Sequence, residues 1–108
     1  MAQLLNGDPR REEFHQILKD TLGSEHVYFQ PPNNLMMNYP CIVYNRGRAS
    51  SEFADNGLYR YVKNYEVLVI DRDPDSEIPD KVAALPMSSH ERWFAVDNLN
   101  HDVFNIYF

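Results

Sequence analysis

The segment that most constrains the fold covers residues 58–70, thirteen residues without glycine or proline. As a single strand it would reach about 40 Å, well beyond the usual length of five or six residues. Its first half is rich in tyrosine, whereas its second half, Val67-Leu68-Val69-Ile70, is apolar on both sides. We therefore expect a strand that starts as an exposed arm and ends inside the core.

The residues before this strand supply a partner and a turn. Residues 46–57 are irregular in pattern and end in Asn56-Gly57, the favoured two-residue hairpin turn, since both residues accept positive φ. The sequence thus predicts a long β-hairpin arm with its tip near Asn56-Gly57. On the long strand, tyrosines 59, 61 and 65 are expected to share a face with Lys63, and Arg60, Asn64 and Glu66 to point the other way.

A helix is predicted near the start of the chain. Asp8 can cap its N-terminus, Pro9 fits the first helical position, and Gly23 can close its C-terminus. Its apolar stripe would consist of Phe14, Ile17, Leu18 and Leu22. Arg10 and Arg11 stand at the positive end of the helix dipole, where we expect them to be solvated or to meet an acidic partner.

The rest of the chain predicts one short helix and four further strands. The helix would start near Ser76 and stop before Pro86, with Ile78, Val82 and Leu85 on its apolar face. Shorter strands are expected at 26–30, 39–44, 88–96 and 101–108, with Trp93 and Phe104 in the core. Residues 1–108 therefore predict a single α+β domain, a mostly antiparallel sheet with both helices on one face.

Composition excludes several classes of protein. The chain has 44% hydrophobic and 24% charged residues, which is ordinary globular usage. Ten Lys and Arg against sixteen Asp and Glu give a formal charge of −6, so binding of DNA through its phosphates is not expected. The single Cys41 allows no internal disulfide. No apolar run is long enough to cross a bilayer, and MAQLLNGDPRREE lacks the pattern of a signal peptide.

Two groups of residues have metal-ligand chemistry but the wrong spacing. Asp71, Asp73 and Asp75 alternate as in a calcium loop, but Ser76 and Val82 replace the required Gly and Glu. We expect a turn whose carboxylates cap the next helix. The second group matches no zinc signature, and we expect it to be polar decoration of a turn: His90, Asp97, His101 and Asp102.

No catalytic motif is present. Cys41 could pair with a histidine, the candidates being His15, His26, His90 and His101, but within YPCIVY it is typical of a small buried hydrophobe. The nucleophile elbow, the Walker A loop and the dinucleotide fingerprint are all missing from the sequence. The prediction is a protein that is not an enzyme and that uses neither a cofactor nor a metal.

Basic and aromatic side chains are interleaved along the predicted arm. This mixture occurs in single-stranded nucleic acid binding and in protein interfaces. Because the surrounding chain is acidic, we favour contact with a protein, either another copy or a partner. The interface candidates are Arg46, Arg48, Phe53, Tyr59, Arg60, Tyr61 and Lys63.

Three stretches of this sequence resemble a known family. YPCIVY, NYEVLVIDRDPDSEIPDKVAALP and ERWFAVDNLNHDVFNIYF are similar to segments of the tail-terminator and tail-completion proteins of long-tailed bacteriophages, which are minor tail, head-tail joining proteins. The resemblance covers roughly residues 26–108. It implies a tail-terminator-like α+β subunit that forms a ring, expected to be hexameric, on the head-proximal end of the tail tube.

The resemblance also implies partners and a location. The partners would be further copies in the ring, the tail tube protein and the head connector or neck protein, with no membrane. The protein would assemble in the host cytoplasm and reside in the virion at the head-tail interface. DNA would pass through the ring without specific binding, because like charges repel. Channel-facing candidates are Glu52, Asp55, Glu66, Asp71, Asp73 and Asp75.

Three other functions stay open at this point. The closest is another neck protein, such as a head-completion or connector-adaptor protein, which differs in its partner and not in its chemistry. A small metal-dependent hydrolase or nuclease would use the Asp and His residues named above. A monomeric accessory protein would use the arm to bind nucleic acid.

Overall fold

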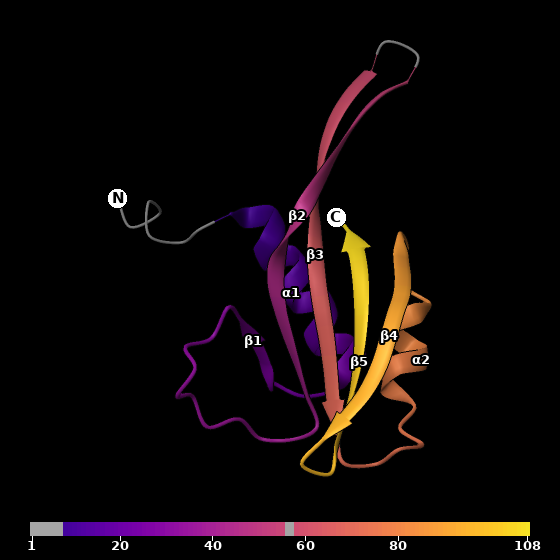
Figure 1. Ribbon diagram of the computed structural model, residues 1–108. Helices are drawn as coiled ribbons and strands as arrows, with labels where there is room; N and C mark the ends of the chain where they lie inside the picture. Colours follow the sequence, from indigo (N-terminus) through magenta and orange to yellow (C-terminus); the bar gives the residue numbers. More distant parts are fainter. Residues whose placement is uncertain (1–7, 56–57) are drawn as a thin grey trace, which may run out of the picture.

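The computed structural model describes residues 8–55 and 58–108, and the side chains of these ranges outside residues 48–61. The molecule is α+β, as predicted, with the expected order of elements (Figure 1). The elements are α1 (Pro9–Leu22), β1 (Val27–Phe29), β2 (Cys41–Asp55), β3 (Leu58–Asp71), α2 (Ile78–Ala83), β4 (Ser88–Val96) and β5 (Leu99–Tyr107).

The strands form one sheet in the order β1-β2-β3-β5-β4. All neighbouring pairs are antiparallel except β1 and β2, which run parallel from Val27↔Ile42 to Phe29↔Tyr44. A parallel pair needs a crossover connection, and the loop between β1 and β2 supplies it. The prediction of a mostly antiparallel sheet is confirmed, with the first strand as the exception.

The predicted β-arm is present in the backbone. β2 and β3 stay paired as far as Asp55↔Leu58, whereas β1 covers only residues 42–44 of β2 and β5 covers residues 64–71 of β3. The distal parts of β2 and β3 therefore form a two-stranded ribbon that extends beyond the rest of the sheet (Figure 1). The predicted turn at Asn56-Gly57 lies outside the described residues.

Both helices cover the same face of the sheet, as predicted. Phe14 of α1 stacks on Tyr65 of β3, with ring centroids 4.9 Å apart, and meets Tyr44 of β2 edge-on at 5.6 Å. Val82 of α2 is fully buried in the same cluster. The other buried members of this helix-side core are Leu18, Val27, Ile42, Val67, Val69, Phe104 and Ile106.

The opposite face carries a second, smaller cluster that the sequence did not predict. Cys41, Val43 and Ile70 are buried there under side chains that include Met37 and Tyr39. These two residues belong to the loop between β1 and β2, so this loop folds over the sheet instead of extending into solvent. The crossover therefore also covers a face that has no helix.

The caps of α1 lie where the sequence places them. The Asp8 carboxylate accepts a 3.0 Å hydrogen bond from the Arg10 backbone N–H. At the other end, Gly23 has φ 83° and its N–H donates to the Lys19 carbonyl. The left-handed φ favours glycine at this closing position.

The two arginines of the first turn contact aromatic rings, which the sequence did not predict. The Arg10 guanidinium lies 4.3 Å from the centroid of the Phe108 ring, and that of Arg11 lies 4.4 Å from the Phe29 ring. Each cation lies over the negative face of an aromatic ring, that of Phe29 in β1 or that of Phe108 just after β5. Arg10 is exposed to solvent, as predicted, whereas the half-buried Arg11 also donates to the Tyr44 hydroxyl instead of meeting an acidic partner.

Trp93 was wrongly assigned to the core. Its side chain is 57% exposed, whereas that of Phe104, on the neighbouring strand, is 1% exposed. The reason is position in the sheet: β4 is the last strand, so Trp93 has a neighbour on one side only. Periodicity along a strand does not report whether the strand is central or at an edge.

Candidate assembly interface

The arm is fixed to the body at its root. The Lys63 ammonium forms a 2.8 Å salt bridge with the carboxylate of Asp8, the cap of α1. The backbone of Lys63 also exchanges hydrogen bonds with Phe108, of 2.9 and 3.3 Å. The hydrogen bond from Lys63 holds the pKa of the Asp8 carboxyl below its ordinary value of 3.8. Helix, arm and chain end thus meet at one point.

A close backbone approach shapes the same root. The regular pairing of β2 with β3 is interrupted between Arg46 and Ser50. Here Gly47 faces the side-chain amide of Asn64, which is 5% exposed, and a Cβ atom on Gly47 would overlap that amide. Gly47 therefore allows the buried Asn64 to occupy the point where the ribbon leaves the sheet.

Beyond its root the ribbon has two open edges. Among the described residues, no third strand pairs with the outer edge of β2 beyond residue 44 or with the outer edge of β3 before residue 64. A two-stranded ribbon is marginally stable in water unless a third strand or another surface packs against it. Its unpaired N–H and C=O groups can accept a strand of another chain. The β2–β3 ribbon is therefore suited to contact another molecule.

The predicted interface residues fall into two groups. Arg46 and Lys63 lie at the root, where the Arg46 N–H donates to the Gln30 side chain and Lys63 is engaged by Asp8. The side chains of the others lie outside the described residues, although their backbones form the ribbon: Arg48, Phe53, Tyr59, Arg60 and Tyr61.

The acidic candidates do not form one surface. Asp71, Asp73 and Asp75 gather where β3 ends, at the opposite end of β3 from the arm (Figure 1). Glu66 lies in the middle of β3 and is half-buried. The side chains of Glu52 and Asp55, on the arm, lie outside the described residues.

The carboxylates after β3 organise their own turn. Asp71 accepts from the Asp73 N–H at 3.1 Å, and Asp73 accepts from the Asp75 N–H at 2.9 Å. The first N–H of α2 is instead bonded to the Ser76 hydroxyl. The expectation that these carboxylates cap α2 was therefore wrong, because the local two-residue contacts satisfy them first.

The histidine and aspartate residues at the last hairpin make separate contacts. His90 forms a 3.0 Å ion pair with Asp102. His101 stacks on Phe94 at 4.6 Å, and its Nδ1 lies 3.1 Å from the Leu99 carbonyl. Among residues 8–55 and 58–108, no three potential ligands come together at a site for a metal ion.

Cys41 and His15 are each tied into the structure. Burial raises the pKa of the Cys41 thiol to about 12, so the thiol is protonated at neutral pH. The Nδ1 atom of His15 lies 2.7 Å from the hydroxyl of Tyr44, which also accepts a 3.4 Å hydrogen bond from Arg11. These contacts join α1 to β2 and do not bring a base to the thiol.

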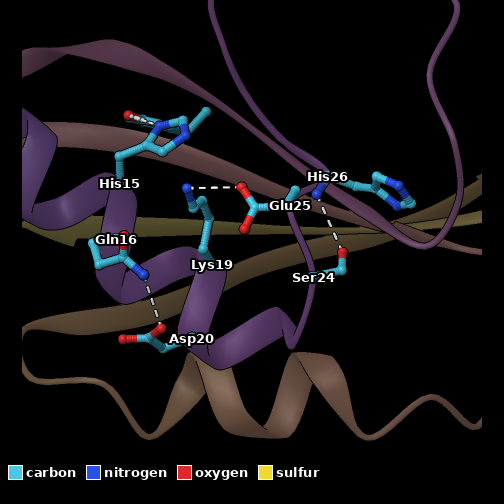
Figure 2. A network of polar contacts seen from close by, with 8 residues as sticks. His15, Gln16, Lys19, Asp20, Ser24, Glu25 and His26 are labelled. Atoms are coloured by element: carbon cyan, nitrogen blue, oxygen red, sulfur yellow. Dashed lines mark hydrogen bonds and ion pairs between the residues drawn. The ribbon is translucent and has the colours of Figure 1, made fainter.

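The outer surface of α1 carries a short polar network (Figure 2). Gln16 donates to Asp20 at 2.9 Å, and Lys19 forms a 2.9 Å ion pair with Glu25. Burial, followed by the charges of Lys19 and Arg11, lowers the pKa of His15 from 6.5. The network fastens the helix to the following turn, and its groups are satisfied by one another.

Exposed apolar side chains mark surfaces that the sequence analysis missed. Met36 is 89% exposed in the loop between β1 and β2, and Trp93 and Val96 are exposed on β4. An apolar hollow of about 380 Å³ lies between α1, the end of β5 and the α2–β4 connection, where Met87 is exposed. These side chains lie in separate segments, and only a contiguous apolar patch is typical of a surface that another protein covers.

The described part of the chain contains no helix that is long and apolar enough to cross a membrane. Comparison with known proteins gives no further identification: no model of a protein family matches the chain, and no curated protein matches it.

Proposed function

We propose that this chain is a structural protein of a phage virion. It caps the head-proximal end of the tail tube as a homo-oligomeric ring, for which we expect six copies, and it joins the tail to the head connector. The observation that carries the proposal is the β2–β3 ribbon, paired to Asp55↔Leu58 but flanked by strands only at its base. The resemblance of residues 26–108 to tail-terminator proteins supplies the biological context.

The ribbon supports assembly because it needs a surface outside its own subunit. A small body covers only part of so long an element, and a neighbouring copy offers the missing contact. The root geometry favours a fixed direction, since Lys63 is bound to Asp8 and Gly47 is closed over Asn64. An arm of fixed direction meets the same place on each neighbour, which a ring requires.

Charge supports passage of DNA without retention. The formal charge of −6 opposes binding of phosphates by counterion release. The exposed carboxylates of Asp73 and Asp75, together with Asp71, are the described candidates for the wall of the channel. In this proposal the ring is a collar whose shape and adhesion matter, and DNA is neither cut nor bound.

The proposal is tested by mixing purified protein with tail tubes that lack their head-proximal cap. Negatively stained images should show added density at one end of each tube, and native mass spectrometry should show a closed oligomer. The control is the same protein mixed with capped tubes, whose ends should not change. Absence of binding to uncapped tubes overturns the proposal.

Binding to heads that carry a portal, instead of to tubes, supports the second candidate, a head-completion or connector-adaptor protein. The same arm and the same charge favour it as well, because both functions use rings at the neck. The two preparations, tested in parallel, separate the functions by partner.

A further inference from the structure

The apolar hollow beside α1 is enclosed by three separate elements. Arg10, Phe14 and Ile17 line it from α1, residues 106–108 line it from the end of β5, and residues 85–87 line it from the connection between α2 and β4. Its volume is about 380 Å³, which lies toward the small end of the range for pockets that hold a ligand. A hollow of this size suits one small molecule.

The walls of the hollow are held in place by contacts within the subunit. Phe14 is 1% exposed and stacks on Phe108, with ring centroids 5.1 Å apart. On another side, the Tyr107 N–H donates to the Met87 carbonyl at 3.2 Å. Met87 has φ 62°, in the left-handed region that residues other than glycine rarely adopt. The hollow is therefore formed before a ligand arrives, which lowers the cost of binding.

The hollow leaves some of its apolar side chains only partly covered. Ile17 belongs to the apolar stripe of α1 but is half-buried, whereas Phe14 and Leu18 of the same stripe are buried. Met87 is 56% exposed. A ligand with an apolar body would remove these side chains from water, which is favourable in proportion to the apolar area that is covered.

Among the described residues that line the hollow, Arg10 alone is charged. Its guanidinium lies 4.3 Å from the centroid of the Phe108 ring, and a guanidinium stacked on a ring keeps N–H donors at its edge that match a carboxylate. No carboxylate of the described residues forms an ion pair with Arg10, and Asp8, two positions before it, is bound by Lys63. The positive end of the α1 dipole adds to the same field.

We propose that this hollow binds a small monocarboxylate with an apolar body, such as a straight aliphatic acid. The apolar body lies against Ile17 and Met87, and the carboxylate accepts hydrogen bonds from Arg10 at the rim. The site goes beyond the proposed function, because its ligand is a small molecule and its binding groups do not belong to the arm.

A second hollow, of about 410 Å³, provides a contrast within the same molecule. It lies beside Met36 and is also lined by a single arginine, Arg72. In the sequence, however, Arg72 stands between Asp71 and Asp73, whose carboxylates are held in the same turn by backbone N–H groups. An anion beside Arg72 would meet these like charges. We therefore expect the carboxylate ligand in the hollow beside α1 only.

The methyl signals of the methionines test the site directly. The full chain, labelled with carbon-13 in its methionine methyl groups, is titrated with octanoate and followed by NMR. The Met87 signal should shift and saturate, with a dissociation constant of about 1 mM or lower. Met36 is 89% exposed beside the second hollow, and its signal is the internal control that should not move. Equal shifts of the two signals overturn the site.

A neutral ligand of the same length isolates the contribution of the carboxylate. We expect 1-octanol to bind at least tenfold more weakly than octanoate, because it lacks the charge that Arg10 meets. Arg10→Gln should raise the dissociation constant of octanoate about tenfold and leave that of 1-octanol unchanged. Arg72→Gln makes the same change at the second hollow and should alter neither constant. Equal effects of the two substitutions overturn the proposal.

Filling the hollow tests its apolar part. Ile17→Trp should abolish binding of both octanoate and 1-octanol, while the Met36 signal and the circular dichroism spectrum stay native. Ile17→Phe adds less volume and protects the test from misfolding, and it should raise both dissociation constants. Unchanged binding in a folded variant overturns the assignment of the ligand to this hollow.

Other occupants of the hollow give different results. If octanoate binds only after Leu4→Ser and Leu5→Ser, the segment before Asp8 fills the hollow. If saturation with octanoate dissociates an oligomer of the chain, a neighbouring copy fills it. Either result, or a Met87 signal that does not shift up to the solubility limit of octanoate, overturns the proposal. Binding to tail tubes is measured separately, so failure of this site leaves the proposed function standing.

Discussion

At the scale of single residues, two aromatic side chains on neighbouring strands have different roles. Phe104 is buried against the helices, whereas Trp93 projects from the outer strand. The degree to which each side chain is buried, and not its residue type, decides how much it contributes to the stability of the fold.

Replacement by alanine separates these two roles. Phe104→Ala should lower the free energy of unfolding by about 3–5 kcal/mol, because it removes a buried ring and leaves a cavity. Trp93→Ala should change it by less than about 0.5 kcal/mol, as is usual at exposed positions. Urea denaturation followed by circular dichroism measures both values. Equal losses in the two variants would contradict the assignment of Trp93 to the surface.

Gly47 is a position where the backbone leaves no room for a side chain. Gly47→Ala should destabilise the fold by about 1–3 kcal/mol, since the new methyl group overlaps the Asn64 amide. The matched test is a double-mutant cycle with Asn64→Ala, which removes that amide. The two changes together should cost less than the sum of the singles, and strict additivity would show that the amide is not the obstacle.

The lowered pKa of His15 has a definite sign for stability. Because the folded state disfavours protonation of His15, the unfolded state binds more protons as the pH falls through 6.5. Stability should therefore decrease below that pH, and Asp8, whose pKa is also lowered, should cause a further loss below its ordinary value of 3.8. His15→Gln should flatten the first decrease in urea midpoints between pH 7 and pH 5. An unchanged slope would show that another group is responsible.

At the scale of elements, the sequence explains the length of the arm and the structure explains its direction. Its length follows from thirteen residues without a breaker, and its direction follows from Lys63 and Gly47 at the root. In the proposed ring the arm contributes to assembly and little to the stability of the subunit, because among the described residues no third strand pairs with its distal half.

Variants on the arm should therefore impair assembly and leave the subunit folded. Arg60→Glu and Tyr61→Ala should reduce ring formation in native mass spectrometry at least tenfold, as loss of an arginine or tyrosine anchor does. Their circular dichroism spectra and urea midpoints should match those of the native chain. Lys81→Glu makes the same charge change as Arg60→Glu on the exposed side of α2 and should assemble normally. Rings of native yield from both arm variants would contradict a role of the arm.

Features determined by neighbours in the sequence were predictable, and features determined by distant residues were not. The Asp8 cap and the Gly23 end of α1 depend on contacts within a few residues. The parallel pairing of β1 and the covering of Cys41 by Met37 depend on how a loop crosses the sheet, which no local pattern reports. Likewise, the exposure of Trp93 depends on the order of strands and not on the composition of β4.

The candidate site divides in the same way. The arm and its basic and aromatic residues were visible as a pattern in one stretch of sequence. The exposed Met36 and Trp93, in contrast, look like ordinary core formers in the sequence. The exposed Met36 is indistinguishable in sequence from the partly buried Met37, because a one-residue step in an irregular loop changes the direction of the side chain.

At the scale of the whole molecule, the subunit is elongated, 48 × 35 × 23 Å, with the arm at one end and the Asp71–Asp75 turn at the other end of β3. The two ends differ in charge. Residues 46–63 contain four basic and two acidic residues, a net charge of +2. Because the whole chain carries −6, the rest of the chain carries −8. A polarity of this kind orders copies head to tail and concentrates negative charge on the body.

This polarity predicts where DNA retention can be created. Assembled native rings should not retain double-stranded DNA at low salt, whereas rings with Asp73→Lys and Asp75→Lys should retain it, and retention should fall steeply as salt rises. The matched control is Glu12→Lys with Glu13→Lys, which makes the same charge change on the exposed side of α1. A filter-binding assay across a salt series measures both variants. If the control rings retain DNA equally well, the turn after β3 does not line the channel, and general surface charge accounts for the effect.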